Sequence, residues 1–204
     1  MGKHWRRFII FAALLLASCI PALAETTTWQ IDPKHSDAQF AITHLMISTV
    51  RGEFHGLKGT VVWDDKNVSN SSVNVTIDAT TVDTREPDRD KDLRSSKFFD
   101  TEKFPAITFK STKVEDAGGG KLKVTGDLTI RGTTKQVILD VTGPKAPIKD
   151  PYGMQRTAVM ATTKINRLDY GVNWNKTLDN GVIMLGDQVE ITIDAEMFVS
   201  PAGK

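Results

Sequence analysis

Apolar and polar residues alternate along most of the chain, which is the pattern of β-strands with one buried face. Phe40, Ile42 and His44 share one face of such a segment, and the residues between them share the other. The last segment of this kind, 189–197, places apolar residues at every second position. Short runs rich in Asp, Asn, Gly and Pro separate the segments, as expected for turns. The sequence therefore predicts successive short strands.

The clearest alternation lies in two neighbouring segments, 122–130 and 137–141, which Arg131-Gly132 joins. A tight turn between two alternating segments predicts an antiparallel hairpin. At least eight such segments occur without an intervening pattern of helices, which predicts an all-β chain with an antiparallel sheet. A sheet whose strands each have one apolar face must either close into a barrel or pack that face against a second layer. An extended, lipocalin-like barrel of about eight strands is the simpler solution, and a two-sheet sandwich is the alternative.

One strongly charged segment interrupts this pattern. Between Asp83 and Lys103, 13 of the 21 residues are charged. Acidic residues come early and basic residues late, with Pro87 at the start, which fits a short helix whose dipole these charges complement. Aromatic residues follow at Phe98-Phe99. This segment is either a solvated helix beside the barrel or a lid over a binding cavity.

Residues 1–24 have the pattern of a cleaved secretory signal. Three basic residues precede an apolar run, 8–17, that is too short to span a bilayer, and the segment ends in Ala22-Leu23-Ala24. We expect cleavage after Ala24, export to the periplasm and a barrel domain over residues 25–204. The alternative is a lipoprotein acylated at Cys19, since residues 16–19 resemble a lipobox.

Composition excludes two classes of protein. Cys19 is the only cysteine, so no disulfide forms within the chain. Without the first 24 residues the chain has 23 basic and 25 acidic residues, a formal net charge of −2. This balance lacks the strongly basic surface of a nucleic-acid-binding protein, so we predict no nucleic-acid partner.

Candidate catalytic residues are few. His35, His44 and His55 follow no paired-ligand spacing, and the chain has no nucleophile elbow or phosphate-binding loop. The acidic pairs Asp64-Asp65, Asp88 with Asp90, and Glu115-Asp116 fall in predicted loops or an exposed helix, where we expect solvated carboxylates. We therefore predict no enzyme activity, no metal site and no cofactor.

Several separated motifs resemble the YceI family of bacterial lipocalin-like proteins. They occur in the family's order and extend over residues 28–198, and motifs in series are more specific than any one alone. The motifs are Phe40-x-Ile42-x-His44-Leu45-Met46, Arg51-Gly52-x-Phe54, Arg89-Asp90-x-x-Leu93-Arg94-Ser95-x-x-Phe98-Phe99-Asp100, Phe104-Pro105-x-Ile107-x-Phe109-x-Ser111, Val124-Thr125-Gly126-Asp127-Leu128-Thr129-Ile130-x-Gly132-x-Thr134, Asp169-Tyr170-Gly171 and Gly186-Asp187-x-Val189.

The resemblance implies a periplasmic protein whose barrel has a helix beside it and an apolar channel for polyisoprenoid lipids, such as isoprenoid quinones or polyprenyl phosphates. Homodimers also occur in the family. Together with the inward apolar faces of the strands, the resemblance predicts the ligand-binding residues. Those expected to line the channel are Phe40, Ile42, His44, Val75, Ile77, Phe98, Phe99, Phe104, Phe109, Leu128, Ile130, Leu139, Val141, Ile191 and Ile193. We expect Arg94, with Arg89 as second candidate, to meet the polar end of the lipid.

Two other functions stay open at this point. One is a periplasmic hydrolase that uses His44 or a metal. The other is an accessory protein with a dry barrel that contacts the membrane or membrane redox proteins through the 89–94 face. The chain length and headgroup of a bound lipid, and whether it is carried, sensed or stored, do not follow from the sequence.

Overall fold

The computed structural model describes residues 26–199, so the predicted signal sequence and the Cys19 acylation site lie outside the described residues. This part of the chain forms eleven strands, one α-helix and three short 3-10 helices. In chain order these are β1 (Thr27–Ile31), β2 (Asp37–His44), β3 (Ser48–Phe54), β4 (Lys58–Trp63), η1 (Val68–Asn70), β5 (Ser72–Asp78), η2 (Ala79–Thr81), α1 (Pro87–Arg94), β6 (Ala106–Gly118), β7 (Lys121–Ile130), β8 (Thr133–Thr142), β9 (Ile148–Lys149), β10 (Gln155–Asn166), η3 (Arg167–Tyr170) and β11 (Leu185–Val199).

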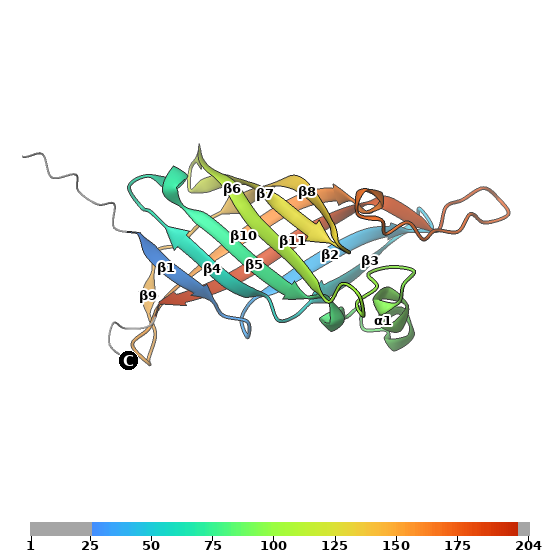
Figure 1. Cartoon of the computed structure of the whole chain (residues 1–204), viewed down its shortest axis with the longest axis horizontal. Helices are drawn as coiled ribbons and strands as arrows, with labels where there is room; N and C mark the ends of the chain where they lie inside the picture. Colours follow the sequence, from blue (N-terminus) through green and yellow to red (C-terminus); the bar gives the residue numbers. More distant parts are fainter. Residues whose placement is uncertain (1–25, 200–204) are drawn as a thin grey trace, which may run out of the picture.

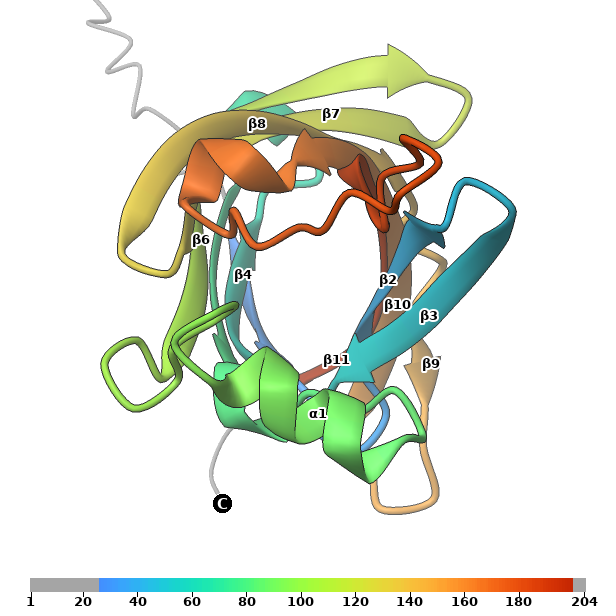
Figure 2. The same ribbon diagram turned by 90° about the vertical axis from the view of Figure 1, so that its right-hand side faces the viewer.

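Eight of these strands close into an antiparallel barrel (Figures 1 and 2). Their order around the barrel is β1, β4, β5, β6, β7, β8, β10 and β11. The barrel closes because β11 pairs with β10 along one edge and with β1 along the other. Closure confirms the predicted lipocalin-like barrel and the short helix beside it, and it rules out the two-sheet sandwich.

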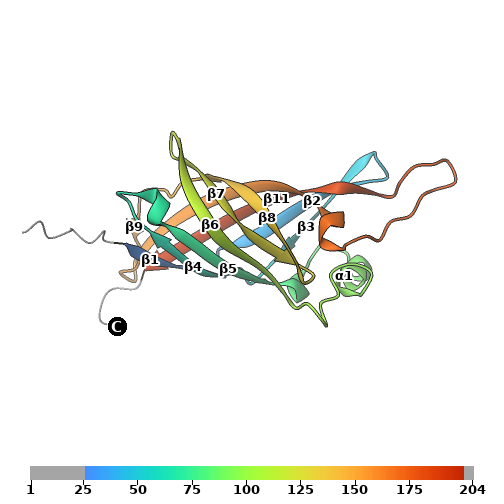
Figure 3. The same ribbon diagram turned by 45° about the horizontal axis from the view of Figure 1, so that its top comes forward.

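Two additions lengthen the barrel wall. β2 pairs with β11 beyond the end of β1, and β3 pairs with β2, so this ribbon extends the barrel toward the end where α1 lies (Figure 3). β9 is a short addition to β10 at the opposite end (Figure 1). The two ends of the barrel are therefore built differently. We call them the α1 end and the β9 end.

The inner face of the barrel follows the predicted alternation. In β7, Leu122, Val124, Leu128 and Ile130 are buried, as expected when successive side chains point to opposite faces. The position between them is Gly126, where a Cβ atom would lie 2.4 Å from the ring of Phe109 on β6. Likewise, a Cβ at Gly52 would lie 2.5 Å from the ring of Phe40. These two glycines leave room for phenylalanine rings on the inner face.

Two carboxylates that the sequence predicts to be solvated are in fact buried. Asp64 is 0% exposed and accepts hydrogen bonds from the Asn70 side chain and the Asn67 backbone, which lower the pKa of the Asp64 carboxyl. Asp90, on α1, is 8% exposed and accepts hydrogen bonds from the amide and hydroxyl of Thr84. The prediction was wrong because donors in the preceding or following turn replace water, a local arrangement that charge counting misses.

Within residues 26–199, none of the helices has the length and apolar character that a membrane-crossing helix needs.

Candidate functional site

A continuous cavity of about 1320 Å³ runs through the interior of the barrel. Every barrel strand contributes to its wall, and most of the contributed side chains are apolar. Trp29 on β1, Val61 on β4 and Val159 on β10 are representative. Figure 2 looks into the barrel from the α1 end, with α1 below and the segment after η3 above. The inward faces of the strands therefore enclose space rather than a filled core.

The structure brings fifteen of the seventeen predicted ligand-binding residues to this cavity. They come from six strands, from α1 and from the segment that follows it. Those that line it are Phe40, Ile42, His44, Val75, Ile77, Arg89, Phe98, Phe99, Phe109, Leu128, Ile130, Leu139, Val141, Ile191 and Ile193.

Arg94 and Phe104 do not line the cavity. The Nη1 atom of Arg94 donates to the carbonyl oxygen of Val82 at 3.2 Å, and the carboxylate of Asp90, one turn earlier on α1, accepts from Thr84. Phe104 packs against Gly132 at the β7–β8 turn, where a Cβ would lie 2.6 Å from its ring. The geometry therefore favours Arg89, the second candidate, over Arg94 as the cation nearest the cavity.

Arg89 is fixed at the α1 end. The carboxylate of Glu86 caps α1 by accepting from the Arg89 amide at 2.6 Å. The Arg89 guanidinium donates from Nε to the Thr84 hydroxyl at 2.7 Å and from Nη2 to the Thr84 carbonyl at 2.9 Å. Glu86, Asp88 and Asp92 also line this end of the cavity. Arg89 is the one lining arginine of the helix beside these three carboxylates, so the α1 side of the opening is acidic.

Aromatic side chains narrow the cavity near α1. The Phe54 ring lies 5.6 Å from that of Phe40 and 5.3 Å from that of Phe99, the latter edge to face. The Phe98 ring lies 5.3 Å from that of Trp174, which belongs to the segment after η3. These are favourable distances for aromatic pairs. They join the segment after α1, β2, β3 and the 171–184 segment around the α1 end of the cavity.

Two polar residues that sequence reasoning missed, Arg167 and Tyr170, also line the cavity. Arg167 is 4% exposed and donates to the carbonyl oxygens of Gly186, Val172 and Trp174. Burial lowers the pKa of Arg167, and the charge of Asp187, 3.3 Å away, opposes that shift. The resemblance motifs include Tyr170, but strand alternation stops before it, so no pattern indicated which way it faces.

Tyr170 is 2% exposed, and burial raises the pKa of its hydroxyl to about 12. The hydroxyl therefore stays protonated at neutral pH and can donate a hydrogen bond. The Tyr170 hydroxyl is not among the fully buried polar atoms left without a partner in residues 26–199. Because Tyr170 lines the cavity, an oxygen of a ligand there can accept a hydrogen bond from this hydroxyl.

The β9 end of the cavity has a different set of charges. Lys66, Lys121 and Lys145 line it, together with Asp65 and Asp116. The three lysines form no ion pair with any residue in 26–199. This end is therefore mildly basic, in contrast to the acidic α1 end.

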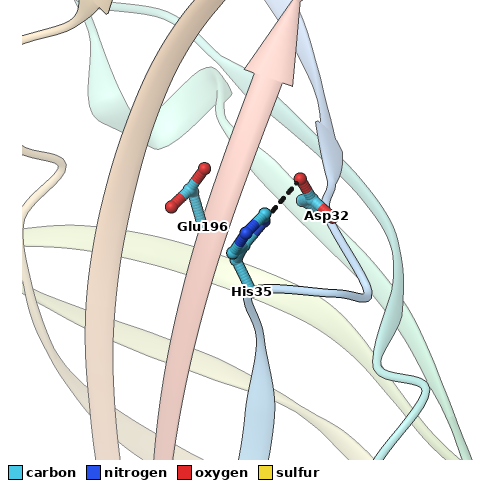
Figure 4. Close-up of side chains that lie close together, drawn as sticks. All are labelled: Asp32, His35 and Glu196. Carbon is cyan, nitrogen blue, oxygen red and sulfur yellow. Dashed lines mark hydrogen bonds and ion pairs between the residues drawn. The ribbon is translucent and has the colours of Figure 1, made fainter.

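Two histidines, predicted to be unrelated to other candidate ligands, each lie beside two carboxylates. His35 Nδ1 bonds Asp32 Oδ2 at 3.0 Å, with Glu196 close by (Figure 4). His55 lies 3.7 Å from Glu53 and 3.9 Å from Asp83. Neither group lines the cavity, and sequence spacing did not reveal them because each includes a carboxylate distant in sequence, Glu196 in the first and Asp83 in the second.

Arg156 occupies the first of these groups. Its Nη1 atom lies 2.8 Å from Asp32 and 2.5 Å from Glu196, and its Nε atom lies 2.7 Å from Asp150. A guanidinium between the carboxylates supplies the positive charge that a metal ion would bring. The cluster therefore serves as an ion-pair network that joins the β1–β2 turn, the β9–β10 turn and β11.

Comparison with known proteins gives the chain a family. Residues 29–197 match the model of the YceI-like domain. The chain is 37% identical over 169 residues to the UPF0312 protein VPA0850 of Vibrio parahaemolyticus, across 82% of this chain and 89% of that protein. The YceI protein of Campylobacter jejuni is similar in structure, with a TM-score of 0.66 at 28% identity across 78% of this chain and 91% of that one.

A more distant structure shares the fold alone. It is a polyisoprenoid binding domain from Saccharophagus degradans implicated in plant cell wall breakdown, with a TM-score of 0.61 at 16% identity. The similarity covers 85% of this chain and 98% of that one. From the match over nearly all described residues and the similarity to the Vibrio protein, we conclude that this chain belongs to the family of YceI-like domains.

Proposed function

We propose that this protein binds a long-chain polyisoprenoid lipid, an isoprenoid quinone or a polyprenyl phosphate, inside the barrel. The observation that carries the proposal is the cavity of about 1320 Å³, walled by apolar side chains from all eight barrel strands. Small-molecule sites typically measure about 300–1,000 Å³, so this cavity suits a larger, elongated ligand. The family and the polyisoprenoid binding domain of the same fold from Saccharophagus degradans support this ligand class.

The energetics suit exchange with a membrane. Burying a CH₂ group from water contributes about 0.8 kcal/mol, so a long chain leaves the cavity for water only at great cost. A bilayer interior is as apolar as the cavity, and transfer between the two costs little. A protein of this kind holds its lipid in water and still releases it to a membrane, which fits transport or storage.

The same arguments favour a binding protein over an enzyme. The family and the lining of the cavity point to binding, and His44, the candidate for hydrolysis, lies at the α1 end with Leu185 opposite it in the neighbouring strand. We infer a periplasmic location from the secretory signal predicted over residues 1–24. The bound lipid is the only small molecule that the proposal requires.

Organic extraction of the purified protein, followed by mass spectrometry, tests the proposal directly. We expect one isoprenoid lipid in near-stoichiometric amount. The control is the same protein unfolded in denaturant, washed with detergent and refolded, which should yield none. Extracts that contain no long-chain lipid from several independent natively purified samples would refute the proposal.

Replacing Tyr170 with phenylalanine should weaken the binding of lipids whose head accepts a hydrogen bond. Loss of one neutral hydrogen bond costs about 0.5–1.5 kcal/mol, so we expect about threefold to tenfold lower affinity for an isoprenoid quinone. Squalene, an isoprenoid without a polar head, should bind both proteins equally. Fluorescence titration of the delipidated proteins measures both affinities.

The matched control for this substitution is Tyr152→Phe, because Tyr152 is 84% exposed. We expect no change in either affinity. Equal weakening of quinone and squalene by Tyr170→Phe would mean that the hydroxyl supports the barrel rather than the ligand.

A further inference from the structure

The loop at the β9 end, residues 143–153, turns two large apolar side chains outward. Ile148 is 66% exposed and Tyr152 is 84% exposed. The first part of the same loop, 143–147, lines the cavity. We call residues 143–153 the β9 loop. One loop therefore forms the rim of the cavity and presents apolar side chains to the surroundings. The label β9 marks its place in Figure 1.

The β9 loop is held in place by its backbone. The Lys145 amide donates to the Ala158 carbonyl at 3.1 Å, and the Lys145 carbonyl accepts from the Thr157 hydroxyl at 2.6 Å. Asp150 accepts from the amides of Tyr152 and Met154 at 2.9 Å. Because these bonds fix the loop, the exposure of its apolar side chains is a property of the fold rather than of a frayed segment.

The lysines at this end outnumber its unpaired carboxylates, Asp65 and Asp116, and so complement an anionic surface. Lys145 and Lys149 lie on the β9 loop, and Lys66 and Lys121 lie at the same rim, all four outside any ion pair in residues 26–199. The acidic residue of the loop, Asp150, is neutralised by Arg156 at 2.7 Å.

The α1 end offers a comparison within the same molecule. Met46 and Ile47, at the tip of the β2–β3 hairpin, are 56% and 85% exposed. The carboxylates of Glu86, Asp88 and Asp92 surround that opening. Both ends therefore expose apolar side chains, but among residues 26–199 the lysines that line the mouth of the cavity lie only at the β9 end.

We propose that the β9 loop docks on an anionic phospholipid surface and brings the β9 end of the cavity against the bilayer. Lysines near an anionic membrane are attracted by its surface potential, and tyrosine is favoured at the interface between headgroups and hydrocarbon. Ile148 adds an apolar side chain at the same level. A lipid then enters or leaves the cavity beneath the docked loop without crossing water. The docking surface stands on its own observations, while its role as a portal rests on the proposed lipid binding.

Vesicle co-sedimentation tests the docking. The protein is used in a Cys19→Ser background, so that no acyl anchor contributes. We expect binding to vesicles of phosphatidylcholine with phosphatidylglycerol, weaker binding to phosphatidylcholine alone, and a decrease with added salt. The double variants Ile148→Ser with Tyr152→Ser, and Lys145→Glu with Lys149→Glu, should each bind the anionic vesicles about tenfold or more weakly.

The matched control replaces the apolar pair at the other end, Met46→Ser with Ile47→Ser, and should bind like the parent. Unchanged sedimentation of both β9-loop variants, or a loss in the Met46 and Ile47 variant, would overturn the proposal. So would a drop in mass by analytical ultracentrifugation in the Ile148 and Tyr152 variant with vesicle binding intact, which would assign the loop to a dimer interface.

Two readouts keep this proposal separate from the proposed function. Lipid extracted from the Ile148 and Tyr152 variant should match the parent, because neither of these side chains lines the cavity, whereas Lys145 does. If no variant or parent contains lipid while vesicle binding behaves as expected, the docking surface stands and the lipid-binding proposal falls. If the parent contains lipid but does not bind vesicles, the lipid-binding proposal stands and the docking surface falls.

Discussion

Replacing Ala161 with tryptophan is expected to empty the cavity of lipid while the barrel stays folded. Ala161 lies near the middle of β10, is 5% exposed and lines the cavity. An indole at this position projects across the path of a bound chain. We expect at least about tenfold less lipid per protein after native purification, and a similar loss of affinity in titrations of delipidated protein.

The neighbouring residue on the same strand supplies the control. Met160 is 44% exposed and faces the outside of the barrel, so Met160→Trp adds the same side chain without narrowing the cavity. Its lipid content should equal that of the parent. Circular dichroism should show the same strand content in both variants. Full lipid occupancy in a folded Ala161→Trp variant would mean that the lipid does not run through the barrel.

Replacing Arg156 with methionine should produce the largest loss of stability. Arg156 bonds three carboxylates, and its removal leaves the largely buried Asp150 without a counter-charge and Asp32 with His35 alone beside it. Breaking such a pair by removing one partner costs about 3 kcal/mol or more. For a domain of this length, that corresponds to a melting temperature roughly 6–12 °C lower. Thermal unfolding of the delipidated proteins measures the change.

The loss should depend on pH in a defined direction. Burial raises the pKa of Asp32, but hydrogen bonds from Arg156 and His35 outweigh it, so the pKa lies well below its ordinary value. A carboxylate with a lowered pKa stabilises the fold above its ordinary pKa, and that contribution disappears as the pH falls through the lower, folded value. The difference between parent and Arg156→Met should therefore stay constant near neutral pH and narrow as the pH falls below 3.8, the ordinary pKa of this carboxyl.

An exposed ion pair provides the control for this network. Lys164 and Glu190 pair at 2.7 Å between β10 and β11, with side chains 58% and 60% exposed. Lys164→Met should cost less than about 1 kcal/mol, because exposed pairs contribute little. A similar cost for Lys164→Met and Arg156→Met would show that burial of the Arg156 network is not what makes it stabilising.

Alternation predicted the strands well because it reports a physical requirement that repeats at every second residue. A residue such as Leu128 must face an apolar interior whether that interior is filled or hollow. The inner face could therefore be named from the sequence, and the cavity itself could not. The existence of the short helix followed from its charges and proline in the same way.

The failures have a different origin. The helix over 87–94 is charged on nearly all sides, so periodicity gave no direction, and Arg94 was preferred to Arg89 without any signal that decides which arginine faces the cavity. Tyr170 lies in an irregular segment, where side-chain direction depends on the turn. The Arg156 network joins positions 32, 150 and 196, and sequence distance carries no information about such contacts.

In a hollow barrel, the bound lipid occupies the space that a side-chain core fills in other proteins. Ligand that binds only the folded chain shifts the folding equilibrium by mass action, so a loaded barrel resists unfolding and proteolysis better than an empty one. Cells short of the lipid would accumulate empty barrels, which open more often and are degraded sooner. The steady-state amount of this protein would then follow the supply of the lipid, without any dedicated regulator.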